Sequence, residues 1–358
     1  VQSNAFWAIG NETVRNDLTF GVRLHGDVVG RVHSEEQYSM TDGVLVANGE
    51  PLNTTLNSDA VALAAALHVH DDIKIGRTHI FPGFRLEMIE GWRTDNDGTA
   101  DDGEMLFRAT PLPGLGGLFA LSSEIDVFAG IHRGFSPVAP GQPSDTQPET
   151  TWNSEVGVSY DGYKGRIESV AYYNDYQNIS GQCSFSSGCE GDDIDGQFNG
   201  GEAVVFGAEL SASTEFFLGT KSALPMSLSY TWTESHFTSS FFSEFPQFGQ
   251  VEAGDSLPYQ PTHSAKAQLG FRYDQLAIYA DCTYRSAMLD RAGSIVDASD
   301  DVPELLLFGA AAHLPLRDNM SIFATISNIT DQRGITSWRP FGARPTPPMR
   351  AMLGLRLN

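Results

Sequence analysis

The chain has few basic residues for its size. Its 358 residues include 22 Lys and Arg against 45 Asp and Glu, so the formal net charge at pH 7 is −23. A surface with this balance repels the phosphate backbone of DNA or RNA. The composition therefore argues against a nucleic-acid partner.

Long hydrophobic runs are also missing. The longest wholly apolar segment, 60–67, has eight residues, whereas a membrane-spanning helix needs about 18. We therefore expect no helix to cross a membrane. Because segment 60–67 is rich in alanine it could be helical by propensity, but its surroundings favour a strand.

Cysteine is scarce, with three residues in the whole chain. Cys183 and Cys189 lie in a stretch rich in Gly, Ser and Asp that is typical of a loop, and a zinc site would need further ligands at the right spacing. We predict a loop disulfide between them, formed in an oxidising compartment. Cys282 falls in an alternating pattern and is predicted to be a small apolar strand residue.

The first residues do not have the pattern of a secretory leader. The sequence opens at Val1 with no Met, no basic segment and no apolar stretch before a small-residue cleavage site. We expect either that a signal was removed or that the chain is a fragment of a longer protein.

What the sequence does contain is a period of two along almost its whole length. From Ser264 to Tyr273, polar or small residues at even positions alternate with apolar residues at odd positions. Such alternation is typical of strands with one apolar face. The same split recurs at 152–160, 226–233, 320–327 and 350–357. We count about 14 strands beginning near Leu18, with Asn4 to Gly10 as the tail of an earlier strand.

The connections between these strands alternate between two lengths. Short turns are predicted near 71–74, 161–162, 219–222, 273–275 and 317–319. Long polar loops are predicted near 33–57, 94–104, 136–148, 178–200, 239–258, 289–302 and 334–346. Regular alternation indicates a meander with one tight and one open end, as in a transmembrane barrel, whereas Greek-key crossings would break it in a soluble sandwich.

Aromatic residues gather near the predicted strand ends, as in the girdles of a membrane barrel. The alternative is that they pack inside a soluble β core. They are Trp92, Phe135, Trp152, Tyr172, Tyr173, Tyr230, Trp232, Tyr259, Tyr279 and Tyr284.

Four segments in order carry a family resemblance. They are Pro-Gly-Phe-Arg-Leu-Glu (82–87), His-Arg-Gly-Phe-Ser-Pro (132–137), Pro-Glu-Thr-Thr-Trp-Asn-Ser-Glu-Val-Gly (148–157), and Ser-Asn-Ile-Thr-Asp-Gln-Arg (327–333) followed by Pro-Met-Arg (348–350). Together they resemble the corresponding segments of TonB-dependent outer-membrane receptors, and most of all those of the ferric citrate receptor-like members. Met349 departs from the usual Gly, and Asn358 stands where the family usually ends in an aromatic residue.

The resemblance implies an all-β fold, a transmembrane antiparallel up-and-down β-barrel of 22 strands around an N-terminal plug, in the outer membrane of a bacterium. Residues 1–358 would be the C-terminal portion, the last 14 strands, with no plug domain in this chain. Contact with the TonB complex would pass through the missing N-terminal part. Lipid and lipopolysaccharide would surround the barrel.

The implied function is uptake of a ferric siderophore, a ferric citrate-like chelate or a similar scarce solute. An anionic chelate needs guanidinium groups that make forked, charge-assisted hydrogen bonds to carboxylates. The alternative is that these arginines pair with loop acids or with lipopolysaccharide phosphates. The candidate ligand-binding residues are Arg133, Arg291, Arg333, Trp338, Arg339 and Arg344.

No cofactor, catalytic site or metal site is predicted. The acidic run 190–195 is interpreted as a solvated loop and not as a site for a divalent ion. His68, His70 and His79 flank a predicted turn and are not expected to bind a metal. Three other functions remain open: a passive channel formed by a smaller self-closed barrel, an outer-membrane barrel enzyme, and a secreted β protein.

Overall fold

The computed structural model describes residues 1–11, 13–96, 103–182, 196–243, 245, 248–293, 301–317, 319–338 and 342–357. Within these ranges all regular structure is β-strand. No described helix is long and apolar enough to cross a membrane.

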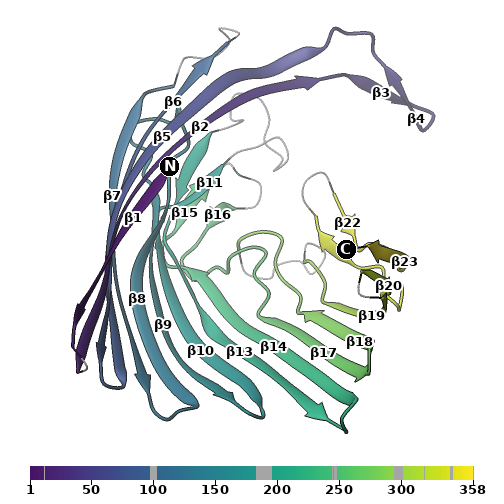
Figure 1. Ribbon diagram of the computed structural model, residues 1–358. Helices are drawn as coiled ribbons and strands as arrows, with labels where there is room; N and C mark the ends of the chain where they lie inside the picture. Colours follow the sequence, from purple (N-terminus) through teal and green to yellow (C-terminus); the bar gives the residue numbers. More distant parts are fainter. Residues whose placement is uncertain are drawn as a thin grey trace.

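Fifteen strands form one antiparallel sheet in which each strand pairs with its nearest sheet neighbours along the chain. Figure 1 shows this sheet curved into an open trough. The strands are β1 (Gln2–Gly10), β2 (Val14–Glu35), β5 (Asn53–Ile75), β6 (Thr78–Asp95), β7 (Leu106–Ala120), β8 (Ile125–Ser136), β9 (Glu149–Gly162), β10 (Gly165–Gln177), β13 (Ala203–Phe217), β14 (Ser222–Phe237), β17 (His263–Tyr273), β18 (Leu276–Arg285), β19 (Leu305–Arg317), β20 (Met320–Ser327) and β23 (Arg350–Leu357).

Short and long connections alternate strictly between these strands. Four long connections contain small hairpins of their own: β3 (Tyr38–Thr41) with β4 (Val44–Ala47), β11 (Ile179–Gln182) with β12 (Gln197–Gly200), β15 (Phe241–Ser243) with β16 (Gly249–Val251), and β21 (Ile335–Ser337) with β22 (Arg344–Pro345). The meander predicted from the sequence is confirmed, and 14 strands follow β1. Segment 60–67 is part of β5, so the strand interpretation is correct there.

Two predicted turns lie at other residues. Segment 71–74 is strand, and the chain turns at 76–77, where Gly76 has a φ of 60°. The turn predicted at 161–162 lies at 163–164. Short turns at 11–13 and 121–124 were not predicted. Gly76 determines where the chain turns after β5, because it can adopt a positive φ. Asp71 and Asp72 fit the pleat of the strand.

The two faces of the sheet differ in polarity. The loop at 137–148 packs against the inner face, where Pro140 lies 3.4 Å from the position that a Cβ on Gly91 would take. On β14 the inner face presents Ser227, Ser229, Thr231 and Thr233, and the outer face presents Met226, Leu228, Tyr230 and Trp232. An apolar outer face and a polar inner face are typical of a barrel in lipid.

The predicted aromatic residues divide between these faces. Phe206 on the outer face meets the edge of Trp232 at 6.0 Å. Strand register places Tyr172 and Tyr279 on the inner face, and Tyr259 lies in a long loop. The residues that share the outer face are Trp92, Trp152, Tyr173, Tyr230, Trp232 and Tyr284.

The sheet does not close on itself within the described chain. Strands β1 and β23 each pair with one neighbour, β2 and β20, and are the two edges. An unpaired strand edge in lipid leaves backbone groups without partners at several kcal/mol each. The arrangement therefore gives no support to a self-closed smaller barrel.

Candidate functional site

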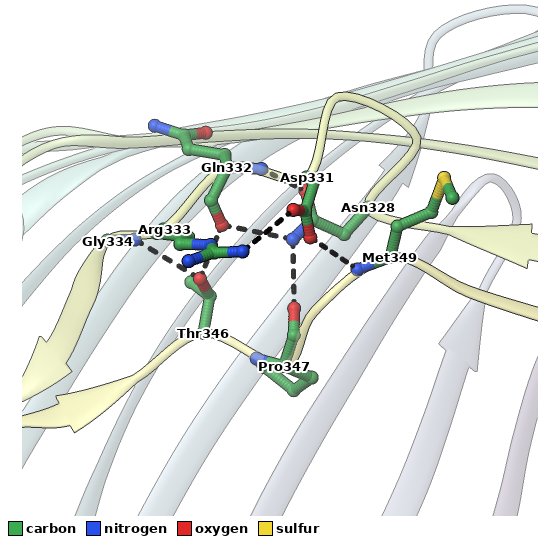
Figure 2. A network of polar contacts seen from close by, with 8 residues as sticks. All are labelled: Asn328, Asp331, Gln332, Arg333, Gly334, Thr346, Pro347 and Met349. Atoms are coloured by element: carbon green, nitrogen blue, oxygen red, sulfur yellow. Dashed lines mark hydrogen bonds and ion pairs between the residues drawn. The ribbon is translucent and has the colours of Figure 1, made fainter.

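The last long connection, 328–349, is anchored at its base by Asn328 (Figure 2). Its side-chain nitrogen donates to the carbonyl oxygens of Gln332 at 3.0 Å and Pro347 at 2.8 Å, and its side-chain oxygen accepts from the Gln332 amide at 2.9 Å. Asn328 is 7% exposed and has a φ of 49°. Asn tolerates this left-handed conformation better than most residues, so one side chain joins both ends of the loop.

Asp331 and Thr346 complete the anchor. The Met349 amide donates to the Asp331 carboxylate at 2.9 Å, and this hydrogen bond, followed by the Arg333 charge, lowers the pKa of Asp331. The Thr346 hydroxyl donates to the Gln332 carbonyl at 2.6 Å and accepts from the Gly334 amide at 3.2 Å. Met349 contributes its backbone amide while its side chain is exposed, so the departure from Gly at this position leaves the contact intact.

Three long loops meet at Tyr259. Its hydroxyl donates to the buried carboxylate of Asp290 and lies 3.2 Å from the Ser337 hydroxyl. Trp338 adds a second link, because its indole nitrogen donates to the Asp301 carbonyl at 3.2 Å. Burial, followed by the hydrogen bond to Asp290, raises the pKa of Tyr259. The sequence did not single out this junction, since its partners come from loops far apart in the chain.

The predicted arginines have different surroundings. Arg333 is 85% exposed and pairs weakly with Asp331 at 3.5 Å. Arg344 is exposed and lies opposite Ser337 in the β21–β22 hairpin, while Arg291 is exposed beside the buried Asp290. No hydrogen bond or ion pair within the described part of the chain joins these arginines to one another. Arg339 lies outside the described residues.

Arg133 lies apart from the others. It stands directly opposite Trp152 in the β8–β9 register, and shares its face with Val127 and Ile131. Residues paired across adjacent strands project to the same side, so Arg133 belongs to the outer, apolar face near the long-loop end. His132 and Asn153, one residue away on each strand, face the lumen instead.

The connection between β8 and β9 folds inward over the lumen wall. Arg108 on β7 donates to the carbonyls of Ser144 at 2.5 Å and Thr146 at 3.2 Å. The Ala139 amide donates to the Gln197 side chain at 2.8 Å. These contacts hold the long polar loop that the sequence predicts near 136–148 against the lumen wall.

Under this loop lies a cavity of about 510 Å³ in the lumen wall. Its polar side is formed by two pairs of side chains on strands that flank β5, His25 with Asp27 at 2.7 Å on β2, and the ion pair Arg85–Glu87 on β6. The second pair comes from the 82–87 motif. The motif therefore places paired charges on the inner wall, at the depth that the inward loop covers.

The remaining predicted features are two cysteines with an acidic run, a third cysteine and a group of histidines. Cys183, Cys189 and the acidic run 190–195 lie outside the described residues. Cys282 is on β18, on the outer face. His79 binds Asp72 at 2.9 Å, and no group of described side chains has the arrangement of a metal site.

Comparison with known proteins agrees with this architecture. A family model described as TonB dependent receptor-like, β-barrel matches residues 2–329. The siderophore receptor PiuA from Acinetobacter baumannii superposes with a TM-score of 0.77 at 16% identity, over 99% of this chain and 55% of that one. The ferric citrate transporter FecA, unliganded, gives 0.74 at 19% identity over 99% of this chain and 53% of that one.

Among curated proteins, the iron-regulated outer membrane virulence protein of Vibrio cholerae is 27% identical over 201 residues, which cover 54% of this chain and 28% of that protein. The chain thus spans about half the length of the solved structures that it matches, and less of this relative. The meander, the apolar outer face and the family match agree with one another, and place the strands in a bacterial outer membrane. The chain belongs to the family of TonB-dependent receptor-like β-barrels.

Proposed function

We propose that the complete receptor takes up an anionic ferric chelate, a siderophore or a ferric citrate-like complex, and that the last long loop supplies its cationic contacts. The supporting observation is the charge of the loops. Each of the other six long connections has more acids than bases, whereas 328–349 has three arginines and one aspartate. The Asn328 anchor holds this one basic loop at the rim.

The chemistry suits the ligand. Arg333 and Arg344 are exposed, and a guanidinium donates in a fork that matches a carboxylate. Trp338 is held by Asp301 and gives a rigid apolar wall beside them. Arg291 and Arg339 are proposed as further contacts.

Arg133 takes a different role in this proposal. Because it lies on the outer face beside Trp152, it is proposed to contact lipopolysaccharide phosphate and not the ligand. Energy for uptake would come from the TonB complex, through a part of the receptor outside this chain.

The proposal is tested by measuring how the complete gene product binds ferric citrate and a neutral ferric hydroxamate, with Trp fluorescence as the readout. A charge-assisted hydrogen bond contributes about 1.5–3 kcal/mol, so R333A with R344A is expected to weaken ferric citrate binding about tenfold or more. R133A is the matched control and should leave it unchanged. Equal loss in R133A, or tight binding of the neutral chelate alone, would contradict the assignment.

A further inference from the structure

The outer face carries a groove that begins at the short β9–β10 turn and that the receptor function does not use. Its volume is about 680 Å³, and it crosses the strands from β9 to β19. Most of its lining side chains project from the apolar face, as the strand register shows. A role for this groove depends on the placement of this face in the outer membrane, and not on the identity of the chelate.

One row of paired residues explains the groove. Reading across the register, Tyr160 and Ile167 stand at one end and Phe308 at the other. Directly opposite neighbours in a sheet lie about 5 Å apart on one face, so small residues between large ones leave a trough. Three of the four intervening positions are small, Ala212, Ala267 and Cys282, and the fourth is Leu228.

A free cation stands at the turn end of this trough. Lys164 lies in the β9–β10 turn, and its carbonyl accepts a hydrogen bond of 2.5 Å from Thr214, which lines the groove. The neighbouring carboxylates are already paired, Asp161 with Arg166 at 3.0 Å and Glu215 with Arg272. Among the described residues no carboxylate is within ion-pair distance of Lys164.

The setting matches one class of ligand. An apolar trough in lipid takes an acyl chain, and a lysine at its membrane-interface end takes a phosphate. The neighbouring Tyr163 is 95% exposed at the tip of the same turn, as interfacial aromatic residues are. Short turns of such barrels face the periplasm, so the leaflet in question is the phospholipid leaflet.

We propose that this groove binds an anionic glycerophospholipid of the periplasmic leaflet, with an acyl chain along the row from Ala212 to Cys282 and its phosphate at Lys164. The proposal commits to this lipid and not to lipopolysaccharide, because the charged end of the groove, Lys164, lies in a short turn, at the opposite end of its strands from the long loops. The receptor would thereby have a fixed lipid contact on the β9–β19 wall.

Native mass spectrometry tests this lipid site. The complete receptor is released from detergent in the presence of phosphatidylglycerol or of phosphatidylcholine of equal chain length, and the lipid that stays bound is measured. A basic residue at a lipid surface contributes about 1 kcal/mol, so phosphatidylglycerol should be retained about fivefold more. K164E should abolish this preference, and K74E, on β5 close to another short turn, is the charge-matched control. A267F should fill the trough and lower retention of both lipids, while A65F, also on the outer face, should not.

Each variant is compared with a control that carries the same change elsewhere on the sheet. A general effect of the change on folding would therefore appear in both members of a pair. Equal retention of the two lipids by the wild type would overturn the proposal, as would an unchanged preference in K164E. Preferential retention of lipid A in competition would also overturn it, and would make the groove a lipopolysaccharide site.

Discussion

Replacing Asn328 by Ala tests the anchor of the last loop. The change removes three hydrogen bonds, two donated to carbonyls and one accepted from the Gln332 amide. It also leaves alanine at a φ of 49°. Each hydrogen bond contributes about 1 kcal/mol net and the left-handed backbone costs alanine roughly 1 kcal/mol, so we expect a loss of about 4 kcal/mol in local stability.

Hydrogen exchange of the Thr346 amide measures this loss, because that amide donates to the Gly334 carbonyl across the base of the loop. A loss of about 4 kcal/mol raises the opening constant roughly a thousandfold. The N178A variant is the control, since Asn178 has a φ of 53° but no side-chain hydrogen bond within the described part of the chain. If N328A exchanged at the wild-type rate, or no faster than N178A, the anchor would not be what holds the loop.

Further expectations follow from the same contacts. Because the pKa of Asp331 is lowered, its ionised carboxylate stabilises the loop base at neutral pH. This stabilisation is lost as the pH falls through the folded pKa, below the usual value of about 4. Hydrogen exchange of the Met349 amide should therefore become faster at low pH in the wild type but not in D331N. Because the pKa of Tyr259 is raised, its neutral hydroxyl stabilises the loop junction below about pH 10, and the contribution is lost as the pH rises through the folded pKa. In a spectrophotometric titration, Y259F should therefore have one late-ionising tyrosine fewer than the wild type. G207A should lower the melting temperature, since its Cβ would lie 2.0 Å from the Trp232 carbonyl, at a cost of about 1–3 kcal/mol; in G117A the nearest atom is 3.7 Å away, and melting should be unchanged.

The strand pattern was predictable because a membrane sheet obeys a simple rule. Along β14 and β20 every second residue meets lipid, so the period of two is read directly from the sequence. The turn near residue 75 was misplaced for a physical reason. Two aspartates indicate a turn by composition, but Asp72 is used on the inner face, where it binds His79 at 2.9 Å.

The site was less predictable, because its contacts join loops remote in sequence. The Asn328–Asp331 motif marked the loop base through the resemblance, and its hydrogen bonds give the reason for both residues. Tyr259 could not be separated from the girdle aromatics by spacing alone, since its partner Ser337 lies 78 residues away. Arg133 lies in a recognised motif, yet only the strand register shows which face it occupies.

The orientation of the sheet is the claim on which both proposals depend, and labelling in intact cells tests it directly. Cysteine placed at Arg333 in the last loop or at Tyr163 in a short turn would be treated with a maleimide on a polymer too large to cross the outer membrane, with wild-type labelling as background. We predict that R333C is labelled in intact cells and that Y163C is labelled only after the outer membrane is permeabilised. Labelling of Y163C in intact cells, with R333C protected, would contradict the account.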